Sequence, residues 1–276
     1  MKGYTAHIPN LVAQDISYAK QHQHVQRISQ ALRMHGILKV VLGFPDESSK
    51  YLQSLMYRLH ERHGHGLPIS HSASRGWFWD VRPRLQNPEH QARSETTEEF
   101  PWHTDCSYET APPRFFARQV LQPDRHGGGT LSVMNVERLG NLLSPRTVAS
   151  LLKPHYRFTI PPEFVKDSSG PGYIVGSVLA ANKTGRVTMV RFREDIITPL
   201  NAEAQDAFQE LKRTLLGLGA QNNIIHLTPE YLPRNAIVLM DNYRWLHARN
   251  QVMDQDRHLR RVRWDATPFP SRSEVP

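Results

Sequence analysis

The stretch Pro-Trp-His-Thr-Asp at residues 101–105 places a histidine and a carboxylate two positions apart. On an extended segment, side chains at positions i and i+2 point to the same side. His103 and Asp105 can therefore enter the coordination sphere of one metal ion. Two ligands do not make a site, so the pair predicts that at least one more ligand comes from elsewhere in the chain.

The third ligand that the sequence favours is His247. It ends the stretch 236–247, in which an apolar segment runs into a short polar turn. Two histidines and one carboxylate on one face of a metal are typical of non-haem Fe(II) oxygenases, in which three positions stay open for cosubstrate and O₂. The chain has 1 cysteine, which excludes an intramolecular disulfide and zinc sites built from several cysteines.

An arginine-rich segment begins ten residues after His247, with four arginines between residues 257 and 263. Arg257, Leu259 and Arg261 would share one face of a strand. A guanidinium is permanently charged and binds a carboxylate through two parallel hydrogen bonds. Arg257 and Arg261 are thus candidates for binding an acid near the metal.

Taken in this order, the motifs resemble those of the taurine-dioxygenase-like family of Fe(II)/2-oxoglutarate oxygenases. His103 and Asp105 match the His-x-Asp motif of the family, and Thr130, after three glycines, matches a Thr or Ser about two dozen residues later. His247 matches the distal histidine, and an arginine follows it. The stretches 241–247 and 257–259 look especially like γ-butyrobetaine hydroxylases, and the resemblance covers most of residues 36–265.

The resemblance implies a mainly β protein with flanking helices, built on a distorted double-stranded β-helix, the jelly roll of cupin-like proteins. It implies Fe(II) bound by His103, Asp105 and His247, with 2-oxoglutarate and O₂ as cosubstrates. The expected reaction oxidises a small-molecule substrate and releases succinate and CO₂. Hydroxylation is the default outcome, while desaturation and cyclisation use the same ligands.

The resemblance also implies binding residues for the two organic molecules. Thr130 and one of the two arginines would hold the distal carboxylate of 2-oxoglutarate. Arg257 matches the family by its neighbours and Arg261 by its spacing. We expect Arg257 to bind the cosubstrate, and Arg261 to bind an acidic group of the substrate or to act as a second clamp.

Two further side-chain assignments concern the surroundings of the metal. Trp77 and Trp79 lie in an aromatic stretch ahead of the first ligand, where relatives build the substrate pocket, so both are candidate substrate residues. Packing in the core is the alternative for both, since large aromatic side chains are mostly buried for their area. Cys106 is expected to point away from the metal, by alternation along a strand.

The rest of the chain predicts one β-rich domain over residues 1–276. Apolar residues recur at helical spacing in 15–34 and 46–62, with a strand at 37–42 between them. From residue 70 on, short apolar runs separated by Pro and Gly favour a sandwich or barrel over βαβ units. We expect a helix–strand–helix flank (1–66), a jelly-roll core with inserted loops (67–266), one strong helix (201–218) and a tail (267–276). The expected strands of the core are 77–81, 115–121, 130–136, 156–160, 173–178, 187–192, 224–227, 236–240 and 259–265.

The composition leaves two alternatives open. A net charge of +8 invites a nucleic-acid-directed protein, but the arginines are scattered and form no basic tail or helical stripe, so we expect no nucleic-acid partner. A jelly-roll metal protein without oxygenase activity, holding zinc, is the second. No apolar run approaches the ~18 residues of a membrane span, and the low cysteine content favours a cytoplasmic location. Neither the substrate nor the oligomeric state can be predicted from the sequence.

Overall fold

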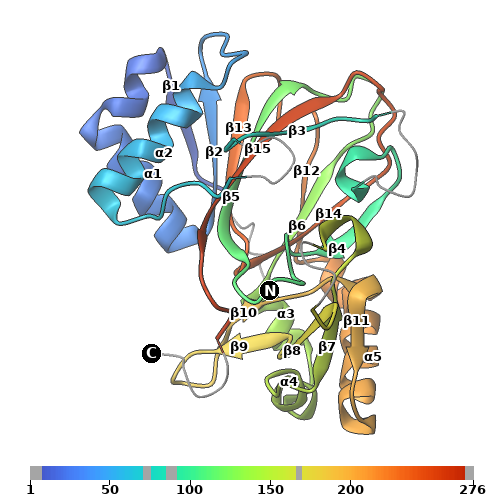
Figure 1. Ribbon diagram of the computed structural model, residues 1–276. Coiled ribbons are helices and arrows are strands. Elements are labelled where there is room, and N and C mark those ends of the chain that lie inside the picture. The colour runs from blue at the N-terminus through green and yellow to red at the C-terminus, as the bar shows by residue number, and fades with distance from the viewer. Residues whose placement is uncertain (1–7, 71–75, 85–91, 166–169, 271–276) are drawn as a thin grey trace.

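Strands dominate the computed structural model, which describes residues 8–70, 76–84, 92–165 and 170–270 (Figure 1). The strands are β1 (Asn10–Ala13), β2 (Ile37–Leu42), β3 (Trp79–Val81), β4 (Phe100–His103), β5 (Pro113–Gln122), β6 (Leu131–Asn135), β7 (Tyr156–Thr159), β8 (Tyr173–Gly176), β9 (Leu179–Ala181), β10 (Val187–Val190), β11 (Ile197–Pro199), β12 (Ile224–Leu227), β13 (Ala236–Asp241), β14 (Trp245–Arg249) and β15 (His258–Ala266). The helices are α1 (His22–His35), α2 (Lys50–His63), α3 (Val136–Leu142), α4 (Pro145–Leu151), α5 (Ala202–Leu216) and α6 (Leu218–Gln221).

Two sheets face each other across a shared core. The larger has the order β1-β2-β13-β5-β15-β3 and the smaller the order β12-β6-β14-β4. All pairs in both sheets are antiparallel except β1 with β2. Phe116 and Val238 of the larger sheet pack in one cluster with Val133 and Trp245 of the smaller. The prediction of a mainly β protein is therefore confirmed.

Strand β13 is buried along its whole length because both of its faces are covered. Ala236, Val238 and Met240 face the smaller sheet, whereas Ile237 and Leu239 pack with the apolar sides of α1 and α2. These two helices lie on the outer side of the larger sheet (Figure 1). The uninterrupted apolar run that precedes His247 thus reflects a strand between two layers.

The end of α1 is held by the turn between β13 and β14. Arg244 donates to the carbonyl oxygens of Arg33 and Met34, at 2.9 and 3.1 Å, and so satisfies carbonyls that a helix end leaves free. Gly36 follows α1 with φ of 68°, and a Cβ there would lie 2.9 Å from Trp245 Nε1. The flank predicted for residues 1–66 is thereby tied to the segment that carries His247.

A third group of elements lies at the other end of the molecule from α1 and α2 (Figure 1). It contains the sheet β11-β7-β8, the β9–β10 pair and the helices α4 and α5, and its core includes Met134 and Leu246 of the smaller sheet. It reaches the smaller sheet at Phe192, which exchanges backbone and side-chain hydrogen bonds with Thr104. This contact fixes the chain on the far side of β4, next to residues 103–105.

Most helix and strand predictions agree with the structure in kind and differ at the ends, but the helix expected over 15–34 is divided into a 3-10 helix at Ile16–Lys20 and α1. Every expected strand is present, and the expected helix at 46–62 begins at Lys50 because Asp46 accepts hydrogen bonds from the amides of Lys50 and Tyr51. The strand expected at 77–81 begins at Trp79. The sequence interpretation missed β1, β4, β9, β11, β14, α3, α4 and α6. Within the described ranges, no helix is long and apolar enough to cross a membrane.

Candidate metal centre and adjoining pockets

Three side chains predicted as ligands converge between β4 and β14. His103 ends β4 and pairs directly with His247 in the antiparallel ladder, with ring centroids 4.2 Å apart. Asp105 Oδ1 lies 3.4 Å from His247 Nε2 and 3.7 Å from His103 Nε2. One ligand atom of each residue lies within 4.8 Å of the others. The three residues are 2%, 5% and 0% exposed, in chain order.

Asp105 reaches this position through a turn. Strand β4 stops at His103, Asp105 opens the turn that follows, and Cys106 has a φ of 57°. Strand alternation therefore predicted correctly that the side chains of His103 and Asp105 lie together. The backbone that brings them together is a turn after β4, not a continuous strand. Strand alternation failed for Cys106, whose Sγ accepts a hydrogen bond from Arg263 and which lines the pocket beside the metal ligands.

Asn242 holds the backbone of Asp105 from both sides. Its Oδ1 accepts from the Asp105 amide at 2.8 Å, while its Nδ2 donates to the carbonyl oxygens of Asp105 and Pro113. The residue is fully buried in the turn between β13 and β14. One turn thus positions two ligands, since Asn242 orients Asp105 and the strand that follows carries His247.

The protonation states of the three residues suit a divalent cation. Burial lowers the pKa of His103 well below its ordinary value, and the neighbouring His247 adds to the effect. Burial alone would raise the pKa of Asp105, yet Arg261, His247 and Arg118 together hold it well below its usual range. Neutral imidazoles beside an ionised carboxylate are the forms that bind metals.

The hydrogen bonding of the His103 ring fits a bound iron ion. Nδ1 of His103 lies 2.7 Å from the carbonyl oxygen of Pro101, to which it donates, so Nε2 carries the lone pair. That Nε2 is buried, faces Asp105 and has no hydrogen-bond partner. A ligand histidine whose other nitrogen donates to a carbonyl is the usual arrangement around protein-bound metals.

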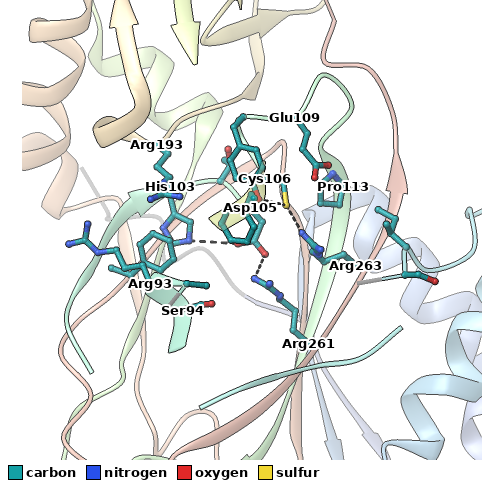
Figure 2. Close-up of a pocket in the computed structure, with 17 residues that line it drawn as sticks. Arg93, Ser94, His103, Asp105, Cys106, Glu109, Pro113, Arg193, Arg261 and Arg263 are labelled. Carbon is teal, nitrogen blue, oxygen red and sulfur yellow. Dashed lines mark hydrogen bonds and ion pairs between the residues drawn. The ribbon is translucent and has the colours of Figure 1, made fainter. Parts of the chain in front are cut away.

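Two arginines flank the carboxylate. Arg261 Nη1 donates to Asp105 Oδ2 at 3.0 Å, and Figure 2 shows this side chain pointing at the carboxylate from below, with His103 to the left. Arg118 Nη2 lies 3.5 Å from Asp105 Oδ1, and the two arginines face each other across the β5–β15 ladder. The sequence interpretation treated Arg118 as scattered charge. The sequence held a signal, because Arg118 shares one face of β5 with the apolar residues Phe116 and Val120, which are buried.

A small cavity of about 40 Å³ collects three buried arginines, Arg118, Arg249 and Arg257. Arg257 is 6% exposed, and burial, with Arg249 and Arg118 nearby, lowers its pKa to about 9. The other lining residues are Val120, Pro123, Asp124, Gly129, Leu131, Leu227, Thr228, Pro229, Leu232, Val238 and Leu259. The cavity thus combines these three arginines and one buried carboxylate, Asp124, with mainly apolar walls.

Thr130 lies beside this cavity, but its side chain is not among those that line it. Its neighbours Gly129 and Leu131 do line it, and the backbone of Thr130 is held by Asn250 through the Thr130 amide, at 2.7 Å, and carbonyl oxygen. Gly129 has a φ of 68°, and a Cβ there would lie 2.7 Å from Arg257 Nε. The glycine run therefore brings the backbone before Thr130 against Arg257.

A larger pocket, about 160 Å³, opens on the metal ligands (Figure 2). Its walls combine apolar side chains with both signs of charge. They include Ile69, Phe100, Tyr108, Pro113, Phe164, Arg93, Glu109, Arg193, Arg261 and Arg263. Arg263 points at Cys106 in Figure 2, and Glu109 lies beyond Cys106. Sequence reasoning had singled out none of these charged residues except Arg261.

Trp77 and Trp79 do not line this pocket. Trp77 packs on the core under α2, with its ring 4.8 Å from that of Tyr57. Trp79 packs with the core between the two sheets, and Arg84 lies over its ring. Core packing, the alternative to a substrate role, accounts for both positions in the part of the chain that the structure describes.

Comparison with known proteins decides the family. The sequence profile of the family described as taurine catabolism dioxygenase TauD, TfdA family matches residues 5–263. The chain belongs to this family. It is an Fe(II)- and 2-oxoglutarate-dependent dioxygenase acting on a small molecule, which confirms the class and the cosubstrates predicted from the order of the motifs.

Solved structures share the fold of the dioxygenase. An asparagine oxygenase in complex with Fe(II), 2S,3S-3-hydroxyasparagine and succinate is 18% identical, with a TM-score of 0.69 and 92% of each chain covered. The non-heme iron oxygenase OrfP in complex with Fe is 13% identical, with a TM-score of 0.65 and 94% of each chain covered. No protein with curated function matches the sequence. At these sequence identities, the likeness shows a shared fold.

Proposed function

We propose that this dioxygenase hydroxylates a small amino acid or a similar zwitterion, at Fe(II) bound by His103, Asp105 and His247. The observation that carries the proposal is the buried convergence of these side chains at the wall of a pocket with charges of both signs. When bound, iron and 2-oxoglutarate supply the oxidising chemistry, with O₂ as oxidant and succinate and CO₂ as coproducts. The protein's own part is to hold both acids in place and to keep water from the ligands.

For 2-oxoglutarate, we assign the distal carboxylate to Arg257. A five-carbon dicarboxylate that binds the metal with its 2-oxo acid end must place its other carboxylate some distance away. Arg257 meets this demand, because it is buried in the cavity next to the ligands and contacts none of them. Arg261 is hydrogen-bonded to Asp105 and so belongs to the metal end. Thr130 follows Gly129 at the edge of this cavity, and we propose that its hydroxyl reaches the same carboxylate when 2-oxoglutarate is bound.

For the substrate, Arg263 and Glu109 are the proposed anchors. Both line the pocket, where a guanidinium suits a carboxylate and a carboxylate suits an ammonium group. Since Arg261 is engaged by Asp105, the acid-binding role predicted for it passes to Arg263 on the same face of β15. The solved structures support this choice, since the asparagine oxygenase was solved with 2S,3S-3-hydroxyasparagine and OrfP with (3S)-hydroxy-L-Arg.

We further propose that the two facing sheets are the halves of a distorted double-stranded β-helix, within one domain over residues 1–276. The antiparallel pairing and the core shared by the two sheets support this arrangement. Residues 1–66 would be the flank, 67–266 the core and 267–276 the tail, most of which lies outside the described residues. The cytoplasmic location stays a prediction.

The test is a screen of L-amino acids with Fe(II), 2-oxoglutarate and O₂, scored by succinate release and by the mass gain of one oxygen atom. We expect one amino acid to raise succinate release above the substrate-free rate, and His103→Ala to abolish it. His226→Ala, which changes an exposed histidine on β12, is the matched control. If only acids without an amino group stimulate release, the substrate class is wrong. If the wild type binds neither Fe(II) nor 2-oxoglutarate, the proposed site is wrong.

A further inference from the structure

We infer that Arg118 couples metal binding to 2-oxoglutarate binding: its guanidinium faces the metal-binding nitrogen of His247, and a metal that takes this nitrogen would shift the guanidinium toward the cosubstrate. The inference rests on the proposed function, because it takes His103, Asp105 and His247 as the ligands. It assigns a role to a residue that none of the motifs includes.

Arg118 lies between the metal ligands and the cavity of Arg257. Its side chain is 13% exposed and leaves β5 on the face that packs toward the smaller sheet. Nη2 lies 3.2 Å from His247 Nε2 and 3.5 Å from Asp105 Oδ1, and the same residue lines the cavity that contains Arg257. Its Nε is buried without a hydrogen-bond partner. The side chain therefore has an unused donor, Nε, at the point where the two binding regions meet.

The contact with His247 competes with a metal. A guanidinium only donates, so the contact at 3.2 Å is a hydrogen bond when the imidazole proton is on Nδ1, the tautomer that also leaves Nε2 able to bind a metal. The same Nε2 is the His247 atom directed at Asp105. A neutral imidazole nitrogen has one lone pair, which serves either the hydrogen bond from Arg118 or a metal ion. Metal binding must therefore release the Arg118 guanidinium.

The charges decide where the released guanidinium goes. Arg118 lies with Arg249 and Arg257 at the cavity, where Asp124 is the carboxylate, and with Arg261 at Asp105. Burial and repulsion from Arg261 lower the pKa of Arg118 to about 10. A divalent metal adds two positive charges beside this group, whereas 2-oxoglutarate adds two negative charges. Each ligand thus lowers the electrostatic cost of binding the other, and Arg118 contacts the region of both. Coupling of this kind is reciprocal, and its usual size is about 5- to 150-fold in affinity.

Titration with Mn(II), in the absence and presence of 2-oxoglutarate, tests the inference without turnover. We expect 2-oxoglutarate to tighten Mn(II) binding to the wild type on the order of 10- to 100-fold. Arg118→Gln and Arg118→Leu should bind Mn(II) alone more tightly than the wild type does, and should show a smaller gain from 2-oxoglutarate than the wild type. Arg118→Lys, which keeps the charge without the planar fork, should fall between. Arg186→Gln, at an exposed ion pair with Glu137, is the control and should match the wild type.

Two charge-removing variants are used because one of them can fail to fold, and circular dichroism will show whether each is folded. Leu is chosen because it suits the apolar face of β5. The inference is overturned if folded Arg118→Gln or Arg118→Leu keeps the wild-type gain, or if it binds Mn(II) alone no more tightly than the wild type. Those results would leave the proposed function standing. If instead the wild type binds neither Mn(II) nor 2-oxoglutarate, the proposed site itself is wrong.

Discussion

The side-chain amide of Asn242 is hydrogen-bonded to both the amide and the carbonyl of Asp105, at 2.8 and 3.0 Å. In effect, a side chain replaces a neighbouring strand at the point where β4 has ended and the chain has turned. The third bond, to the carbonyl oxygen of Pro113, ties this turn to the start of β5. The orientation of the carboxylate ligand thus depends on a residue 137 positions away in the sequence.

Replacing Asn242 by Ala should weaken metal binding more than it unfolds the protein. Removal of groups that orient metal ligands usually costs about 10- to 100-fold in metal affinity, and we expect a loss of this size for Mn(II). Equilibrium dialysis measures the loss, and thermal unfolding monitors the fold. Asn182→Ala removes a comparable turn amide in the β9–β10 hairpin and should leave the affinity unchanged. Equal affinities in the two variants would refute the role of Asn242.

The metal-free protein should lose stability as the pH falls below 6.5. Burial lowers the pKa values of His103 and His247 in the folded protein, while an unfolded chain has the ordinary value of 6.5. Below that pH the unfolded state binds more protons, so each histidine reduces the free energy of unfolding by up to about 1.4 kcal/mol per pH unit. Asp105, whose pKa is also lowered, contributes only below 3.8. Urea unfolding between pH 7.5 and 5 checks this slope, which His103→Gln should reduce; a flat profile would contradict it.

Gly129→Ala should impair 2-oxoglutarate binding, and Gly127→Ala should not. Both glycines have positive φ, at 68° and 84°, so both variants carry similar backbone strain. A Cβ at residue 129 would lie 2.7 Å from Arg257 Nε, whereas a Cβ at residue 127 meets nothing within 4 Å. We expect a rise on the order of tenfold in the KM for 2-oxoglutarate, the equivalent of about 1.4 kcal/mol. Similar values for the two variants would argue against Arg257 as the cosubstrate residue.

Arg249→Met should weaken the hydrogen bonding that holds residues 93–98, just before β4. Arg249 donates to the carbonyl oxygens of Ser94, Thr96 and Glu98, and Ser94 lines the larger pocket. Without these bonds the carbonyls must find water, so the local opening energy falls. Hydrogen exchange at residues 93–98 should become faster, while exchange in β13 stays as in the wild type. Unchanged exchange at 93–98 would show that other contacts hold this segment.

The order of the motifs was enough to predict the class of enzyme and the three side chains that the structure brings together. The chemistry requires the His-x-Asp motif, a distal histidine and a following arginine. Each of these motifs is short, so it can be recognised in the sequence. Alternation of apolar residues likewise predicted the strands, since a buried strand needs an apolar face wherever it lies. The predicted ends of helices and strands were less accurate. At α2, for example, the Asp46 carboxylate accepts from the amides of Lys50 and Tyr51, so the helix begins at Lys50.

What the sequence by itself determined is therefore the chemistry: the donor types, the arginines available for acids and the β character of the core. Only the tertiary structure decided which residues share a space. Arg118 meets His247 because β5 packs across the core from β14, and Trp77 and Trp79 pack away from the pocket that their position suggested. Asn242 reaches Asp105 because a turn follows β13 there. Contacts of this kind depend on the pairing of strands far apart in the chain, and local patterns carry no record of that pairing.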